Sequence, residues 1–279
     1  MRKPVKMVAL DLDGTALDPF GRITEREERA FKRAMDMGVH IVVATGRAFH
    51  SLPDNVFSIG GIEYAVTSNG AQVTRLKDRT LIYENCIAAA SVTEIADVLE
   101  KAGVRAEAFT DGRAYIDVSE FNAIKSGEIR TRDSVYVLST RNPVDDIFAF
   151  MREHRGRIEN ISINYPSDEA KEKFSKVLRE IPGVTVTTSF ALNNEIGGAT
   201  TSKADGLSHL MERLGVTAGE LMACGDSPND GAMIRMAEIG VAMGNADDAV
   251  KEMADYVTGT NAEDGVAGAI EKFVLGESI

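Results

Sequence analysis

The sequence predicts an α/β fold, with a doubly wound parallel-sheet core and an inserted α+β domain. Short apolar runs alternate with helical segments in the first third of the chain, the alternation stops near Glu84, and it returns after about Phe190. Alternating strands and helices favour a parallel sheet with helices on both faces. We therefore expect a core made of residues 1–83 and 190–279, and an inserted domain made of residues 84–189.

The first three strands are predicted at residues 5–10, 39–44 and 64–67. Each is a short, uniformly apolar run, as expected for a strand that is buried on both faces. Thr24 and Glu27 form a capping-box pattern that begins a helix between the first two strands, and Gly38 ends it. A shorter helix is expected up to about Phe57.

The inserted segment has a different pattern. Asp111-Gly112 separates two strand-like runs, at residues 104–109 and 114–118, and predicts a hairpin. Further strands are expected at residues 134–139, 158–164 and 184–188, and helices at residues 91–101, 168–180 and after Pro143. Beyond residue 190 we expect strands at 221–224 and 241–243 and helices at 203–214, 230–237, 247–253 and 266–273.

Two carboxylates follow the first predicted strand, in the segment Asp11-Leu12-Asp13-Gly14-Thr15. Ligands of open α/β sheets bind outside the carboxyl ends of the strands. With a side-chain period near two, Asp11 and Asp13 point the same way, and their repulsion raises one pKa. The pair suits a nucleophile beside a protonatable acid. An acidic turn without chemistry is the alternative.

The end of the second strand and the start of a later helix offer phosphate-binding groups. Thr45-Gly46-Arg47 supplies a hydroxyl and backbone N–H groups, although a simple turn explains this pattern as well. Lys203 follows Thr200-Thr201-Ser202 and begins a predicted helix, where a cation opposes the helix dipole. A residue placed against its local preference suggests a function, and a solvated lysine is the alternative.

A third strand end carries Asp226-Ser227-Pro228-Asn229-Asp230. Two carboxylates and an amide form an all-oxygen site that suits Mg²⁺, which binds few carboxylates together with water and substrate phosphate. An Asx turn with a helix cap is the alternative for this segment alone. Polar groups at three strand ends and at the start of one helix together favour a functional site.

Composition excludes several classes of function. The formal net charge of −12 disfavours nucleic acid and anionic membrane as partners, because both need a basic surface. No run approaches the length of apolar residues that spans a bilayer. The two cysteines, Cys86 and Cys224, provide no disulfide framework and fit a reducing compartment. We therefore expect a cytoplasmic protein.

These motifs occur in the order found in the haloacid dehalogenase-like hydrolases, and the chain most resembles their Cof-type sugar-phosphatase branch. The resemblance rests on DLDGT, TGR, the helix-opening lysine and GDSPND. Further matching segments are Ser68-Asn69-Gly70-Ala71, Val241-Ala242-Met243-Gly244-Asn245-Ala246 and Asn261-Ala262-Glu263-Asp264-Gly265-Val266. The resemblance implies a Rossmann-like core and an inserted cap that closes over the substrate and reads its organic part.

The resemblance also implies a role for each matching residue. Asp11 would be the nucleophile that forms an aspartyl-phosphate, and Asp13 the general acid and base. Mg²⁺ would be held by Asp11, by the Asp13 carbonyl and by Asp226. The residues implied in phosphate binding are Thr45, Gly46, Lys203 and Asn229.

Three further residues have supporting roles in this reading. Asp230 would act with Asn229 to support the metal-bound waters and orient Lys203. Arg47 and Asn69 are candidate substrate contacts.

The leading hypothesis is therefore a Mg²⁺-dependent phosphatase of small phosphorylated metabolites, sugar phosphates among them. A phosphomutase would share the aspartyl-phosphate, and production of free phosphate separates the two. A binding or sensor protein with an inactive site is the alternative from another class, and Asp11, Asp13, Lys203 and Asp226 argue against it. The substrate and the oligomeric state do not follow from the sequence.

Overall fold

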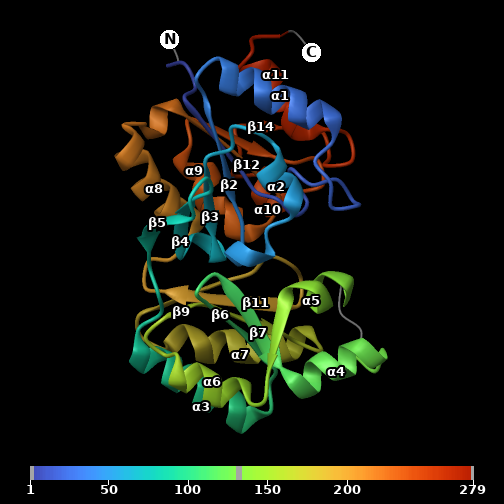
Figure 1. Ribbon diagram of the computed structural model, residues 1–279, viewed down its shortest axis with the longest axis vertical. Helices are drawn as coiled ribbons and strands as arrows, with labels where there is room; N and C mark the ends of the chain where they lie inside the picture. The colour runs from blue at the N-terminus through green and yellow to red at the C-terminus, as the bar shows by residue number, and fades with distance from the viewer. Residues whose placement is uncertain (1–2, 130–133, 278–279) are drawn as a thin grey trace. The chain divides into compact units, whose positions relative to one another are not determined.

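The computed structural model describes residues 3–129 and 134–277. The chain forms two compact units, each with its own sheet (Figure 1). The core unit contains the chain up to Gly46, Pro53–Tyr83, and the chain from Ser202 onward. The inserted unit contains Arg47–Leu52 and Glu84–Thr201. The α/β fold class predicted from the sequence, with its Rossmann-like core and inserted α+β cap, is confirmed.

The core unit is built on an eight-stranded sheet with the order β14-β13-β12-β1-β2-β3-β4-β5. Neighbouring strands from β14 to β3 are parallel, and β4 is antiparallel to β3. The strands are β1 (Met7–Leu10), β2 (His40–Ala44), β3 (Tyr64–Thr67), β4 (Gln72–Arg75), β5 (Thr80–Glu84), β12 (Leu221–Gly225), β13 (Ile239–Ala242) and β14 (Tyr256–Val257). The central strand β1 is fully buried, as its apolar sequence requires.

Helices cover both faces of this sheet. They are α1 (Glu25–Asp36), α2 (Asp54–Ser58), α8 (Lys203–Leu214), α9 (Gly231–Met236), α10 (Asp248–Lys251) and α11 (Gly265–Phe273). Leu207 and Leu210 of α8 and Met233 of α9 pack with Met7 and Ala9 of β1 in one apolar cluster. The helices α1 and α11 lie side by side (Figure 1), and Thr24 caps α1 by accepting a hydrogen bond from the Glu27 N–H.

The inserted unit has a six-stranded sheet with the order β10-β11-β9-β6-β7-β8. Its strands are β6 (Ala106–Thr110), β7 (Arg113–Asp117), β8 (Arg141–Val144), β9 (Ile158–Asn164), β10 (Val184–Thr187) and β11 (Asn193–Gly198). The helices are α3 (Ala89–Ala102), α4 (Val118–Ser126), α5 (Ser134–Thr140), α6 (Ile147–Glu153) and α7 (Asp168–Glu180). Figure 1 shows α3, α6 and α7 on one face of the sheet, and their apolar residues share one core with β6 and β9.

The structure corrects two expectations for the inserted segment. Residues 134–139, expected as a strand, belong to α5. Val137 is buried with Ile116 and Ile124, Tyr136 and Leu138 are partly buried against the same cluster, and Val135 is 79% exposed. The second core segment begins at Ser202 rather than at residue 190, because β11 pairs with β9 and β10. The sequence of β11, Asn-Asn-Glu-Ile-Gly-Gly, has no apolar run that would predict a strand.

Among the residues that the structure describes, no helix combines the length and the apolar character that crossing a bilayer requires.

Glu27 of α1 is a buried carboxyl next to the start of α11. It accepts hydrogen bonds from the backbone N–H groups of Val266 and Ala267, and its Oε2 atom is buried with no hydrogen-bond partner. Burial raises the pKa of Glu27 from its ordinary value of 4.5 to about 8, and the nearby Asp264 carboxylate adds to the rise. Glu27 therefore keeps its proton in the native state at neutral pH.

The Glu27 side chain makes the free energy of unfolding depend on pH. Between about 4.5 and about 8 the native state binds the Glu27 proton more tightly than the unfolded state, so this contribution to stability falls as pH rises. Glu27→Gln removes the ionisation, so we expect the variant to gain stability relative to wild type as pH rises through this window. Urea unfolding of both proteins at several pH values measures the difference. A difference that does not change with pH would contradict the prediction.

Candidate active site

The predicted site residues follow four strands whose carboxyl ends lie along one edge of the core sheet. Asp11 follows β1, Thr45 follows β2, Ser68-Asn69-Gly70 follows β3 and Asp226 follows β12. These four strands are consecutive neighbours and all parallel, so their carboxyl ends point the same way. The Asp11 N–H donates to the Cys224 carbonyl of β12 at 3.1 Å, which continues the ladder into the site.

Lys203 joins two of the aspartates at this edge. Its Nζ atom donates to Asp11 Oδ1 and to Asp230 Oδ1, each at 2.6 Å. The exposed fraction is 1% for Lys203, 5% for Asp11 and 0% for Asp230. The solvated lysine considered from the sequence is therefore excluded: this lysine is a buried cation held between two carboxylates.

The loop after β3 sets the position of Lys203. Gly70 has φ +102°, and a Cβ atom there would lie 1.9 Å from the Ser202 carbonyl oxygen. Only glycine allows the loop to approach the start of α8 so closely. Ser202 caps this helix by accepting a hydrogen bond from the Asp205 N–H at 3.1 Å. Lys203 thus begins its helix directly against the end of β3.

The turn after β12 holds Asp230 beneath the site. Asp230 Oδ2 accepts hydrogen bonds from the backbone N–H groups of Asp226 and Ser227, each at 3.0 Å. A Cβ atom at Gly225 would lie 2.4 Å from the Cβ atom of Asp230, so a larger residue would displace the carboxylate. Asp230 therefore has one oxygen on the backbone and the other on Lys203.

Asp226 is held by two hydroxyl groups. Thr15 Oγ1 donates to its Oδ1 atom at 3.0 Å, and Ser227 Oγ donates to its Oδ2 atom at 3.1 Å. Gly14 has φ +83°, and a Cβ atom there would lie 2.5 Å from Asp226 Oδ2. The turn after β1 therefore packs directly on the Asp226 carboxylate.

The cluster carries more negative than positive charge. Oxygens of Asp11, Asp226 and Asp230 lie within 4.8 Å of one another, and Lys203 is the cation that contacts two of them. Burial raises the pKa of Asp11 despite the opposing effect of Lys203, and the other carboxylates raise it further. Burial and Asp230 raise the pKa of Asp226 to about 6. An all-oxygen donor set with unbalanced negative charge fits a small divalent cation such as Mg²⁺.

Asp13 occupies a different environment from Asp11. β1 ends at Leu10, and Asp13 lies in the following turn, where it is exposed while Asp11 is buried. The Asp13 carboxylate still contributes to the raised pKa of Asp11, as the smallest of the causes, after burial and the other carboxylates. The pKa of Asp11 is therefore raised as expected, but mainly by burial, and the repulsion from Asp13 makes only a small contribution.

The amide groups predicted for phosphate and substrate form a second cluster. Asn229 Nδ2 donates to Asn69 Oδ1 at 3.0 Å, and the Asn69 N–H donates to the Thr45 carbonyl at 3.1 Å. Gly46 follows Thr45 in the same loop. Arg47 belongs instead to the inserted unit, where its guanidinium lies 4.4 Å from the ring centre of Tyr136 and donates to the Ser51 carbonyl.

Two contacts of the site were not predicted from the sequence. Thr15 and Ser227 hold Asp226, yet neither was singled out. Both belong to motifs identified in the sequence, DLDGT and GDSPND: Thr15 lies two residues after Asp13 and Ser227 directly after Asp226. For Ser227 the available signal was a hydroxyl next to a carboxylate in a turn, and for Thr15 it was the last position of the DLDGT motif.

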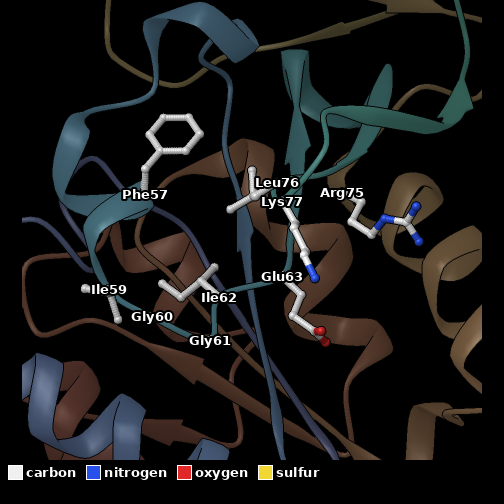
Figure 2. Close-up of a pocket in the computed structure, with 9 residues that line it drawn as sticks. All are labelled: Phe57, Ile59, Gly60, Gly61, Ile62, Glu63, Arg75, Leu76 and Lys77. Atoms are coloured by element: carbon white, nitrogen blue, oxygen red, sulfur yellow. The ribbon is translucent and has the colours of Figure 1, made fainter.

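A separate pocket lies at the amino end of β3, the opposite end from the aspartate cluster. Figure 2 shows that Phe57, Ile59, Ile62 and Leu76 contribute much of its lining. None of the site residues predicted from the sequence lines this pocket.

The chain matches the family model of haloacid dehalogenase-like hydrolases over residues 8–270. It is 30% identical to the 5-amino-6-(5-phospho-D-ribitylamino)uracil phosphatase YcsE of Bacillus subtilis, with 97% of this chain and 96% of that protein covered. A haloacid dehalogenase-like hydrolase structure from B. subtilis superposes with a TM-score of 0.85 at 27% identity, covering 96% of this chain and 99% of the other. The subclass IIB sugar phosphatase BT4131 gives 0.82 at 25% identity, covering 96% and 99%.

The chain therefore belongs to the haloacid dehalogenase-like hydrolases. It is a phosphoric monoester hydrolase, and the predicted likeness to the Cof-type branch is confirmed.

Removing the buried lysine should destabilise the core unit strongly. Lys203→Met leaves Asp11 and Asp230 buried without their cation, and breaking a buried ion pair in this way costs about 3–5 kcal/mol. Urea unfolding followed by circular dichroism measures the loss. Lys32→Met is the matched control, because Lys32 pairs with Glu28 on the exposed face of α1, where such a pair contributes about 0–1 kcal/mol. Equal losses in the two variants would contradict the prediction.

Proposed function

We propose that this phosphatase hydrolyses phosphomonoesters of small metabolites through an aspartyl-phosphate on Asp11, in a reaction that depends on Mg²⁺. The observation that carries the proposal is the buried contact of Lys203 with Asp11 and Asp230 at the carboxyl edge of the sheet. A lysine in this place neutralises charge where an anionic substrate has to meet an anionic nucleophile.

The first half of the reaction transfers the phosphoryl group to Asp11. A carboxylate oxygen of Asp11 attacks phosphorus in line, the new bond forms, and the bond from phosphorus to the ester oxygen breaks. Asp13 gives its proton to that leaving oxygen. The exposed position of Asp13 suits this role, because the acid has to reach a substrate atom that enters from solvent.

The second half returns Asp11 to its starting state. Asp13, now ionised, takes a proton from a water molecule, whose oxygen attacks phosphorus. The bond between phosphorus and Asp11 breaks, inorganic phosphate leaves, and Asp13 is again protonated. The same residue thus acts as acid and then as base.

The groups around Asp11 suit an in-line transfer. Lys203 would balance charge on the phosphoryl oxygens, and Thr45, Gly46 and Asn229 would donate hydrogen bonds to them. Asn229 and Thr45 are already connected through Asn69, which supports a common role. Asp230 would keep Lys203 oriented, since its other oxygen is fixed by two backbone N–H groups.

Asp11, the Asp13 carbonyl and Asp226 would hold Mg²⁺. When bound, the ion would offset the negative charge of the substrate phosphate and of the aspartates. The support for this assignment is the all-oxygen cluster with its raised pKa values, because buried carboxylates in excess of their cations are stabilised by a divalent ion.

The inserted unit is proposed to determine which organic group is accepted. The chemistry assigned above uses residues of the core unit, and none of it depends on the organic part of the ester. The substrates in the names of the relatives differ in their organic part: one relative is named a 5-amino-6-(5-phospho-D-ribitylamino)uracil phosphatase and another a sugar phosphatase. Arg47 of the inserted unit and Asn69 of the core unit remain candidate substrate contacts.

Release of inorganic phosphate from a panel of phosphomonoesters tests the proposed function. The panel contains sugar phosphates, nucleotide-related phosphates and p-nitrophenyl phosphate, each measured with and without Mg²⁺. We expect Mg²⁺-dependent release by wild type and a loss of on the order of 10⁴-fold or more in Asp11→Asn, which keeps the shape but removes the nucleophile.

Asn55→Ala is a control for handling and folding, because Asn55 donates to the Gly21 carbonyl in an exposed hydrogen bond away from the aspartate cluster. Release of phosphate by Asp11→Asn at the wild-type rate would overturn the assignment of the nucleophile. Transfer of the phosphoryl group to a second sugar without free phosphate would instead identify a mutase.

A further inference from the structure

Two asparagines outside the reaction scheme contact the turn that carries Asp13. Asn245 lies in the loop after β13, and Asn261 lies in the loop before α11. Both belong to segments that the sequence analysis identified as matching the family but to which no role was assigned. Both segments lie in the core unit, together with the turn after β1.

The contacts form a continuous chain of hydrogen bonds. Asn245 Nδ2 donates to the Gly14 carbonyl at 2.8 Å, and Asn245 Oδ1 accepts from the Asn261 N–H at 2.9 Å. Asn261 Nδ2 donates to the Leu17 carbonyl at 2.8 Å. The two side chains therefore bind the turn at the carbonyls of Gly14 and Leu17, and the Asn245 side chain also binds the backbone of Asn261. We call Asn245 and Asn261 the asparagine clamp.

The turn itself is closed by backbone contacts near Asp13. The Thr15 N–H and the Leu17 N–H both donate to the Leu12 carbonyl, and Asp13 and Leu17 form a β-bridge. The clamp thus holds the turn at Gly14, directly after Asp13, and at Leu17, its partner across the bridge. The hydrogen bonds at Gly14 and Leu17 therefore fix the position of the Asp13 backbone.

Glycines bring the two loops of the clamp together. The Gly244 N–H donates to the Gly259 carbonyl at 3.0 Å, and a Cβ atom at Gly244 would lie 3.0 Å from the Thr260 nitrogen. At Gly265 a Cβ atom would lie 2.2 Å from the Gly259 oxygen. A larger residue at Gly244, next to Asn245, would separate the two loops, and one at Gly265 would distort the segment that contains Asn261.

We propose that Asn245 and Asn261 are positioning residues for the general acid Asp13. Among the described residues the two asparagine side chains donate no hydrogen bond to Asp11 or Lys203, and they hold the turn that carries Asp13. The same turn carries the Asp13 carbonyl proposed for Mg²⁺, so saturating Mg²⁺ is needed to observe the effect of the clamp on proton transfer to the leaving oxygen. This inference rests on the proposed function, because it needs Asp13 to be the acid. General acid catalysis contributes about 10²–10⁴-fold, and a displacement near 1 Å can cost about 10²-fold.

The dependence of rate on the leaving group tests this proposal. A p-nitrophenolate leaves without help from an acid, whereas an alkoxide of a sugar needs a proton as the ester bond breaks. The quantity measured is kcat/KM, which covers only the steps up to release of the leaving group. It is compared between p-nitrophenyl phosphate and the best alkyl phosphate of the panel at saturating Mg²⁺.

We expect Asn245→Ala to lower kcat/KM on the alkyl phosphate by about 10–100-fold and on p-nitrophenyl phosphate by less than about threefold. Asn261→Ala should show the same selectivity with a smaller loss, because it removes only the contact at Leu17. Asp13→Asn provides the reference pattern, and Asn55→Ala, also an amide that donates to a backbone carbonyl, should change neither rate.

Equal losses on both substrates in both clamp variants would overturn the proposal, because a general disturbance of the site or of Mg²⁺ binding does not distinguish leaving groups. Unchanged rates on both substrates would overturn it as well. If Asn245→Ala does not fold, Asn261→Ala decides by the same comparison. Failure of wild type to hydrolyse either ester would instead refute the proposed function.

Discussion

The contact of Lys203 with Asp11 and Asp230 is the interaction on which the rest of the site depends. Placing a lysine and two aspartates in the interior is costly, and only close, well-oriented contacts offset the loss of hydration. The structure meets that demand by fixing Lys203 and Asp230. Ser202 caps the helix of Lys203, and the Asp226 and Ser227 N–H groups hold the far oxygen of Asp230.

Close backbone approach is the second constraint. Gly14, Gly70 and Gly225 each stand where a Cβ atom would collide with Asp226, Ser202 or Asp230. These glycines let three turns from separate parts of the chain meet around one small volume. The same volume collects more carboxylates than cations, and the resulting excess of negative charge favours a divalent ion there. Such an ion would offset the repulsion between these carboxylates and an anionic phosphate ester. The close packing of these three turns therefore brings together both the buried ion pairs and the carboxylates proposed to bind the metal ion.

The sequence predicted β1, β2, β3, β12 and β13 of the core sheet because these strands are short apolar runs, whereas β4, β5 and β14 were not predicted. Asp11 and the turn with Asp226 and Asp230 come together because parallel strands present their carboxyl ends at one edge. Lys203 joins them because the start of its helix lies against Gly70. Strand periodicity could not place Asp13, since β1 ends before it and a turn determines its environment.

Elements without a clear periodic pattern were harder to predict. β11 is polar and glycine-rich and is a strand because it pairs with β9 and β10, which no local pattern reveals. Residues 134–139 contain residues with a preference for strands, yet they form a helix that packs Val137, Tyr136 and Leu138 against Ile116 and Ile124, contacts that no local pattern reveals. The hydroxyl contacts of Thr15 and Ser227 depend on side-chain geometry within turns, and spacing along the chain does not indicate which oxygen a hydroxyl will reach.

The most direct test is to stop the reaction with acid during turnover of a ³²P-labelled substrate and to map the labelled peptide. An aspartyl-phosphate resists acid briefly and is lost in base, so the label is recoverable. We predict that it lies on the peptide that contains Asp11, that it forms only with Mg²⁺ present, and that it is absent in Asp11→Asn. Label on another residue, or label that persists in Asp11→Asn, would contradict the assignment of Asp11 as the nucleophile.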